Sequence, residues 1–237
     1  LLIIQRQTPV YIPDLSLDKY TLNPGEEVKI SARVFNLDET LSGKNFLKIT
    51  VKKGTAIVKT FDDSLDSIGA KSGVDIVQNF NLDKYAGPGS YVVEAELRDI
   101  SNELKYVRSI NFQINAITQP STEYTTRSGG YSILFSSVSI QVKNEGNVDL
   151  QPHTLTESVP KFAATLFDPD IEPVATDSSD DRVVYTWDIP LLTPGAQYTV
   201  AYKIAIWRIW LVFGLLAGVG YGAYRWLSKP RIGKLTR

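Results

Sequence analysis

The chain has 237 residues, one His, no Cys, no Met and a formal net charge of −1. That charge is uneven, because residues 1–203 carry a balance of −7 and residues 204–237 carry a balance of +6 with no acidic residue. Without Cys the chain cannot form a disulfide, a zinc–thiolate site, an iron–sulfur cluster or a cysteine nucleophile. A blue-copper site is excluded as well, and a Ser-His-Asp triad would depend on His153 alone. Basic residues form no long run before residue 204, so we do not expect nucleic acid as a partner.

Residues 1–9 are treated as a separate N-terminal segment. Leu1–Ile4 is apolar and gives way to the polar residues Gln5 and Arg6. Such a stretch is typical of the end of a signal peptide or of an N-terminal anchor, and equally of an ordinary first strand. Both interpretations stay open.

Alternation of apolar and polar residues dominates the sequence from residue 10 to residue 203. This period of two predicts antiparallel strands with one buried face and one solvated face. The expected strands are Val28–Val34, Leu47–Val51, Tyr91–Leu97, Ile110–Ile114, Ile133–Val142, Val183–Trp187 and Tyr198–Tyr202. We expect no amphipathic helix before residue 204.

A Pro-Gly pair precedes an alternating run three times, at Gly25, Gly89 and Gly195. Proline presets φ at the first central position of a turn, and glycine tolerates the positive φ at the second. The pattern predicts type II turns that lead into strands. The polar, Gly-rich stretch Thr118–Gly130 is interpreted as a domain boundary whose Thr and Tyr content also suits an edge strand.

These observations predict an all-β fold with two immunoglobulin-like β-sandwich domains followed by one transmembrane α-helix. The domains are expected at 10–117 and 118–203, the helix at 204–227, and a basic cytoplasmic tail at 228–237. The helix prediction depends on the uncharged run between Arg208 and Arg225. Residues 204–227 would form about 36 Å of helix, enough to cross a hydrocarbon core of about 30 Å.

Aromatic and basic residues at the two ends of this segment are typical of the membrane–water interface. The expected interface residues are Trp207, Arg208, Trp210, Tyr221, Tyr224, Arg225 and Trp226. The basic residues that follow set the orientation, which places the C-terminus in the cytoplasm and residues up to about 203 outside it. They are Lys229, Arg231, Lys234 and Arg237. The alternative is a buried core helix at the end of a soluble domain.

Glycines recur every fourth residue inside the segment, at Gly214, Gly218 and Gly222. This spacing places them on one helix face, where small residues allow another helix to approach closely. We therefore expect a lipid bilayer and the helices of other membrane protein subunits as partners. The alternative is that glycine is simply frequent in membrane helices.

The two halves of the chain resemble known envelope modules. Pro13–Leu17 followed by Leu22–Asn36 resembles the opening of the cell-adhesion-related (CARDB-like) sandwich modules of archaeal and bacterial surface proteins. Val142–Val148, Thr156–Pro160 and Tyr185–Gly195 together are similar to the repeated domain of archaeal S-layer-type envelope proteins. The order of a Trp-Asp strand and one trailing helix is also similar to the β subunit of the eukaryotic translocon-associated complex. The resemblance implies a structural or binding module, and no catalytic residue of these families maps onto this chain.

Other candidate sites each have an ordinary structural explanation beside the functional one. The acidic stretch Asp168–Asp181 supplies oxygen ligands that suit Ca²⁺, but it lacks EF-hand spacing and also reads as a solvated loop. Asp62, Asp63 and Asp66 form a weaker candidate of the same kind. His153 is either a pH-sensitive group or an ordinary loop residue, and Trp187 is either a core residue or a sugar-stacking platform. We assign no cofactor and no metal.

The expected function is that of a non-catalytic, single-pass membrane subunit whose extracytoplasmic sandwiches brace or cap a partner complex. The last predicted strand runs into the helix with almost no linker over Lys203–Trp207. Such a junction suits a subunit that packs on a neighbour better than an adhesin that reaches outward. A membrane-anchored adhesin or ligand-binding module, and an auxiliary subunit of a membrane enzyme, remain alternatives.

Overall fold

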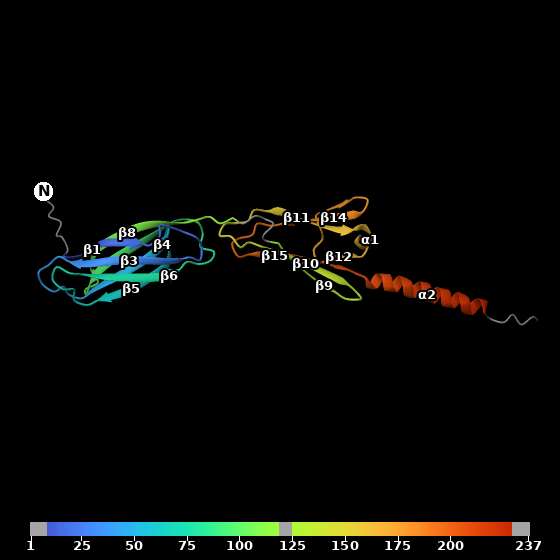
Figure 1. The fold of residues 1–237 in the computed structure, drawn as a ribbon, viewed down its shortest axis with the longest axis horizontal. Helices are drawn as coiled ribbons and strands as arrows, with labels where there is room; N and C mark the ends of the chain where they lie inside the picture. Colours follow the sequence, from blue (N-terminus) through green and yellow to red (C-terminus); the bar gives the residue numbers. More distant parts are fainter. Residues whose placement is uncertain (1–8, 119–124, 229–237) are drawn as a thin grey trace, which may run out of the picture. The chain divides into compact units, whose positions relative to one another are not determined.

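The computed structural model of the chain describes residues 9–118 and 125–228, which are mostly β-strand. The described chain divides into two compact units, whose strands are labelled in Figure 1. Unit 1 comprises the residues up to 118 together with the segments 145–150 and 193–195. Unit 2 comprises the other described residues, helix α2 included.

Unit 1 is built from two sheets. The three-stranded sheet has the order β1-β3-β6, with strands β1 (Val10–Leu17), β3 (Glu27–Asn36) and β6 (Gly73–Asn81). The five-stranded sheet has the order β2-β8-β7-β4-β5, with strands β2 (Thr21–Leu22), β8 (Leu104–Ile114), β7 (Gly89–Asp99), β4 (Asn45–Lys53) and β5 (Ala56–Leu65). Strand β2 runs parallel to β8, and the other pairs of unit 1 are antiparallel.

Apolar side chains from both sheets form a single core in unit 1. Along β3 the buried residues are Val28, Ile30, Ala32 and Val34, which is the alternation that the sequence predicts. Strands β4 and β7 contribute buried residues in the same way. The exposed residues of β3 are all charged, so burial and sequence pattern agree along this strand.

Unit 2 also contains two sheets and two helices. One sheet has the order β12-β15-β10-β9, with strands β12 (Phe167–Pro169), β15 (Gln197–Ile204), β10 (Ser136–Lys143) and β9 (Thr125–Tyr131). The other has the order β11-β14-β13, with strands β11 (His153–Pro160), β14 (Arg182–Ile189) and β13 (Ala175–Ser178). The helices are the short α1 (Lys161–Ala164) and the long α2 (Trp207–Leu227).

Aromatic side chains join the two sheets of unit 2. Phe167 of β12 stacks on Tyr185 of β14, with ring centroids 3.9 Å apart. Trp187 is 1% exposed, and its indole Nε1–H donates to the Ile171 carbonyl at 2.8 Å. The prediction that Trp187 is a core residue is therefore confirmed, and its burial excludes the sugar-stacking alternative.

The remaining strand predictions agree with the structure except at one place. The Pro-Gly turns are confirmed at Gly25 and Gly195, whose φ values are +80° and +79°, whereas Gly89 has a φ of +117° and is already the first residue of β7. The expected strand Ile133–Val142 is wrong at its start, because β10 begins at Ser136. Residues 133–135 instead form a turn that is closed by the side chain of Ser132. The edge-strand interpretation of the boundary stretch is confirmed by β9, which lies at the edge of its sheet.

Among the described residues, no helix has both the length and the apolar character needed to cross a membrane. The prediction of a transmembrane helix over 204–227 is therefore not confirmed. Ile204 ends strand β15, so the helix begins only at Trp207, and Arg208 and Arg225 lie within it and lower its mean hydropathy. The predicted topology residues Lys229, Arg231, Lys234 and Arg237 and the segment Leu1–Ile4 lie outside the described residues.

Burial of Trp187 predicts a large stability cost for its truncation. Trp187→Ala should lower the free energy of unfolding of unit 2 by about 3–5 kcal/mol, since it leaves a cavity and orphans the Ile171 carbonyl. The measurement is urea unfolding of the full chain in mild detergent, followed by near-UV circular dichroism. Trp226→Ala is the matched control, because Trp226 is 72% exposed and should cost less than about 0.5 kcal/mol. Equal costs for the two variants would contradict the prediction.

Candidate functional site

The junction between strand β15 and helix α2 is held in place by backbone contacts on both sides of the chain. Ile204, the last residue of β15, is paired with Ser136 of β10 on one side and with Phe167 of β12 on the other. The next amide, that of Ala205, donates to the Leu166 carbonyl at 2.8 Å. Only Ala205 and Ile206 separate the strand from the helix, so the start of α2 is held by the sheet.

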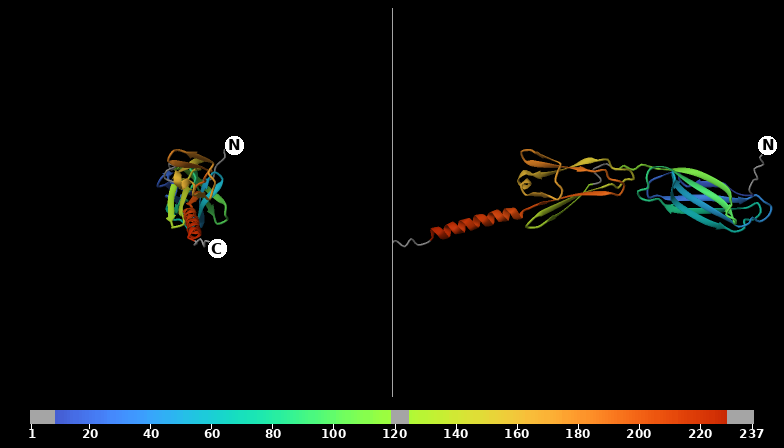
Figure 2. Two further views of the ribbon diagram at one scale, coloured as in Figure 1. Left: turned by 90° about the vertical axis from the view of Figure 1, so that its right-hand side faces the viewer. Right: turned by 180° about the vertical axis from the view of Figure 1, so that it is seen from behind.

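The first turn of α2 is also attached to the turn that joins β9 and β10. The Trp207 amide donates to the Leu134 carbonyl at 2.7 Å. The Trp210 indole Nε1–H donates to the Ile133 carbonyl at 3.1 Å. Arg208 lies over the ring of Trp207, with its guanidinium carbon 5.9 Å from the ring centroid. The predicted interface residues Trp207, Arg208 and Trp210 therefore lie in the first turn of α2, beside the sheets of unit 2. Figure 2 shows how α2 extends away from these sheets.

Beyond this turn, α2 has no partner in the described part of the chain. All its 21 residues are exposed, which gives about 31 Å of uncovered helix. A Cβ added at Gly214, Gly218 or Gly222 would meet no atom within 4 Å. The far end of the helix carries the other predicted interface residues, which are Tyr221, Tyr224, Arg225 and Trp226. The structure thus spreads the predicted residues over both ends and one face of a single exposed helix.

A buried polar cluster holds the edge strand β9, and with it the turn that contacts α2. Glu157 of β11 accepts from the Tyr202 hydroxyl at 2.8 Å and forms an ion pair with Arg127 of β9 at 2.7 Å. Burial raises the pKa of the Tyr202 hydroxyl, and the neighbouring Glu157 carboxylate raises it further. The hydroxyl therefore stays protonated and remains a donor. Sequence reasoning missed this cluster, because its three members are far apart in the chain and no local pattern relates one to another.

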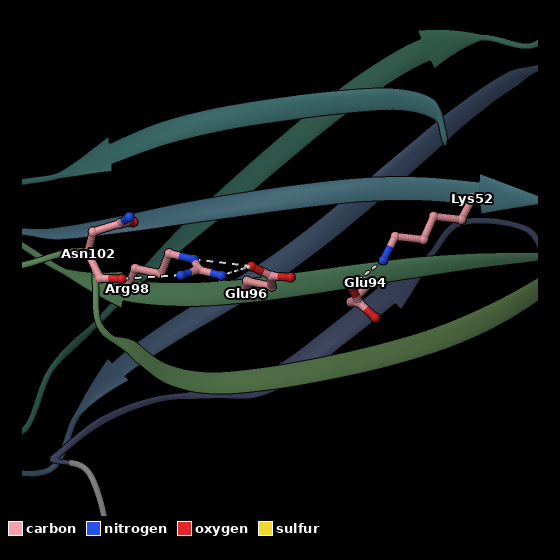
Figure 3. A network of polar contacts seen from close by, with 5 residues as sticks. All are labelled: Lys52, Glu94, Glu96, Arg98 and Asn102. Carbon is pink, nitrogen blue, oxygen red and sulfur yellow. Dashed lines mark hydrogen bonds and ion pairs between the residues drawn. The ribbon is translucent and has the colours of Figure 1, made fainter. Parts of the chain in front are cut away.

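A second surface lies on the solvated face of the five-stranded sheet of unit 1. Figure 3 shows Lys52 paired with Glu94 at 2.5 Å and Arg98 paired with Glu96 at 2.7 Å. Arg98 also donates to the Asn102 carbonyl at 3.2 Å. The hydrogen bond from the Arg98 guanidinium lowers the pKa of Glu96 below its usual range. Part of the sequence signal was present, because Glu94 and Glu96 occupy polar positions of the alternating run that begins at Tyr91, whereas Lys52 comes from β4.

The same face carries a shallow depression of about 480 Å³. It is lined by Phe46, Lys48, Asp62, Arg98 and Asn102. The aromatic ring and the charged groups around it could contact a polar ligand or another protein.

The metal-site candidates are dispersed. Asp168 lies in β12 and Asp177 in β13, whereas Asp180 and Asp181 lie in the turn before β14. No group of three or more His, Asp or Glu side chains within residues 9–118 and 125–228 is placed to hold a metal ion. Asp63 instead accepts two hydrogen bonds from the Gln78 amide, at 2.9 and 3.0 Å.

His153 opens strand β11. Its Nδ1 lies 3.1 Å from the Gln151 carbonyl oxygen. It borders a shallow depression with Asp188 and Pro190 among the other lining residues. This contact is with a backbone carbonyl. Among the described residues, no titratable side chain is hydrogen-bonded to the imidazole.

Comparisons with known proteins do not assign this chain to a family. No family model matches it, and no curated protein matches it. Among solved structures, a Paenibacillus cycloisomaltooligosaccharide glucanotransferase complexed with cycloisomaltoheptaose matches 45% of this chain at 16% identity and a TM-score of 0.36. A Pseudomonas fluorescens alkylpurine DNA glycosylase bound to DNA matches 46% at 19% identity and a TM-score of 0.35. The matches span 14% and 31% of those two chains, and at these TM-scores they carry no argument about function.

The buried polar cluster predicts coupled stability effects. Glu157→Ala should lower the free energy of unfolding by about 1–3 kcal/mol, because the buried Tyr202 hydroxyl loses its acceptor. In Tyr202→Phe chains the same Glu157→Ala change should cost less, since no buried donor is left unpaired. Urea unfolding of the two single variants and the double variant measures this difference. Strictly additive costs would contradict the assigned contact.

The depressed pKa of Glu96 predicts a pH-dependent contribution from its ion pair. A carboxyl whose folded pKa lies below the ordinary 4.5 adds stability above that pH and loses it as the pH falls through the folded value. Arg98→Met should therefore cost about 0.5–1 kcal/mol at neutral pH, and the cost should shrink on acidification below about pH 4. Unfolding measured across pH tests this. In a Glu96→Gln background the cost of Arg98→Met should not change with pH.

Proposed function

We propose that this chain is a non-catalytic, membrane-anchored subunit whose two β units lie outside the cytoplasm and brace a partner complex. The observation that carries the proposal is helix α2, which is fixed to a folded unit at its start and is exposed along its whole length. A helix whose apolar side chains all face water gains no stability from their burial. We therefore expect α2 to lie in a non-aqueous environment. A bilayer supplies such an environment.

The ends of α2 support a membrane location. Trp207 and Trp210 at one end, and Tyr224 and Trp226 at the other, are residues that favour the headgroup layer. Arg208 and Arg225 can extend toward the headgroups on opposite sides. The basic residues that follow the helix in the sequence favour a cytoplasmic C-terminus, which would leave both units on the other side.

The glycine face supports a helical partner in the membrane. Gly214, Gly218 and Gly222 face open space, so a second helix could approach the backbone there without steric conflict. Since α2 falls short of the apolar character of a solitary span, packing against partner helices would also shield its less apolar positions. A bracing subunit is favoured over a long-reaching adhesin because the β15–α2 junction contains only two residues.

We further infer that both units are immunoglobulin-like sandwiches of the kind found in envelope proteins. Support comes from the alternating burial along β3 and β7 and from the aromatic contacts that join the sheets of unit 2. The composition, with no Cys and a single His, suits a structural role better than a catalytic one.

A second candidate function is ligand binding at the depression on the five-stranded sheet. It is favoured by the half-exposed ring of Phe46 beside Arg98 and Asp62. A glycan-array experiment with the wild-type chain and a Phe46→Ala chain distinguishes it, since a binding module would lose signal in the variant and a bracing subunit would show none in either.

Membrane extraction tests the main proposal. The full chain should remain in the membrane pellet after alkaline carbonate treatment and should elute with partner subunits after mild detergent extraction. Gly218→Leu should reduce the share of the chain in that complex severalfold, because the larger side chain separates the helices. Val219→Leu is the matched control, since it alters the neighbouring helix face. Release by carbonate would contradict the anchor, and a solely monomeric wild-type chain would contradict the subunit role.

A further inference from the structure

Exposed apolar side chains gather at the end of unit 2 from which α2 emerges. We name this set the apolar rim, and it consists of Tyr131 at the end of β9, Ile133, Leu134 and Phe135 in the β9–β10 turn and Phe162 in α1. Their exposed fractions are 81%, 69%, 50%, 42% and 79%. Turns between strands are usually polar, so a turn that displays three large apolar side chains needs a surface to bury them.

The turn is held in a defined shape. The Ser132 amide donates to the Phe135 carbonyl at 2.8 Å. The Ser132 hydroxyl oxygen accepts from the amides of Leu134 and Phe135 at 3.3 and 3.1 Å. These bonds hold the backbone of the turn together with the two that its carbonyls accept from α2, and its apolar side chains stay exposed.

The rim lies on both sides of the point where α2 begins. Ile204 pairs with Ser136, which follows the turn, and with Phe167, which follows α1. The amides of Ala205 and Trp207 then donate to carbonyls of the α1 side and of the turn side, at Leu166 and Leu134. Figures 1 and 2 show the β9–β10 turn and α1 at the same end of unit 2 as the start of α2.

We propose that the apolar rim inserts into the headgroup–acyl boundary of the bilayer that holds α2. This inference rests on the proposed function, because it requires α2 to be embedded in the membrane. The turn of the rim accepts hydrogen bonds from Trp207 and Trp210. It therefore enters the interface together with the first turn of the helix.

The chemistry of the rim fits a lipid interface better than a protein partner. Tyr, Trp and Phe are the side chains that favour this layer, and Lys161 and Arg208 stand beside them to meet lipid phosphates. Asp180 and Asp181 lie in a turn that contacts α1, where the Lys161 amide donates to the Asp181 carbonyl at 2.9 Å. Such a mixture suits the headgroup layer and not the hydrocarbon core, so the insertion is shallow. With contacts on two sides of α2, unit 2 would be held against the membrane surface and would not swing about a single tether.

Single-cysteine labelling tests the rim, and the absence of native Cys makes every label site-specific. Ile133→Cys reports on the rim, and Ile100→Cys in unit 1 is the matched control, because these residues are 69% and 73% exposed. Leu216→Cys reports on α2. Each full chain carries an environment-sensitive fluorophore and is reconstituted into phosphatidylcholine vesicles with lipids that carry a quencher near the headgroup or deep in the acyl chain.

The label at residue 133 should shift to the blue and lose most of its emission to the shallow lipid quencher, while the label at residue 100 should lose almost none. Aqueous iodide should give the reverse order. If the label at residue 216 escapes both lipid quenchers, the anchor itself is wrong. If residue 216 is quenched but residue 133 responds to iodide as residue 100 does, the rim proposal is wrong while the anchor stands. Shielding of residue 133 from both iodide and lipid would mean that a protein covers the rim, which also overturns the proposal.

Discussion

The pairing of strand β15 on both of its edges controls the arrangement of everything at the end of unit 2. Because Ile204 is paired with both β10 and β12, the chain stays in the sheet until it has passed that residue. Only two residues remain before the helix, so the direction in which α2 starts is set by the sheet. The same two ladders place the β9–β10 turn and α1 on either side of the helix start. The proposed anchor and the proposed lipid contacts both depend on this one constraint.

A polar cluster that is buried at Glu157 and Tyr202 and exposed at Arg127 supports this constraint. Strand β9 is exposed along its length and has a free edge, so its packing against the opposite sheet is weak. The Arg127–Glu157–Tyr202 contacts connect β9 to β11 and β15 and hold the edge strand in place. A loss of this cluster would therefore also act on the turn that contacts Trp207 and Trp210, because that turn follows β9 directly.

Much of the fold could be predicted because a strand with one buried face leaves a period of two in the sequence. The burial of Trp187 and the positive φ of Gly25 follow from such local signals. Local signals failed at Ile133–Phe135, where an apolar run reads as strand but the Ser132 side chain closes a turn. They also missed α1 and the buried cluster. Part of the candidate site was predicted, because the aromatic and glycine positions of α2 follow from their spacing in the sequence. The apolar rim was not predicted, because its residues come from three separate elements.

By itself, the sequence determined the β-rich character of residues 10–203, the strands whose residues alternate most regularly and the uncharged run between Arg208 and Arg225, since each depends on residues close together in the chain. Only the tertiary structure decided where the helix begins, because Ile204 is still paired with β10 and β12 as the last residue of β15 and so does not join the helix. Only the tertiary structure, too, brought Phe162 and the β9–β10 turn to the start of α2, because strand pairing links segments that no local pattern relates.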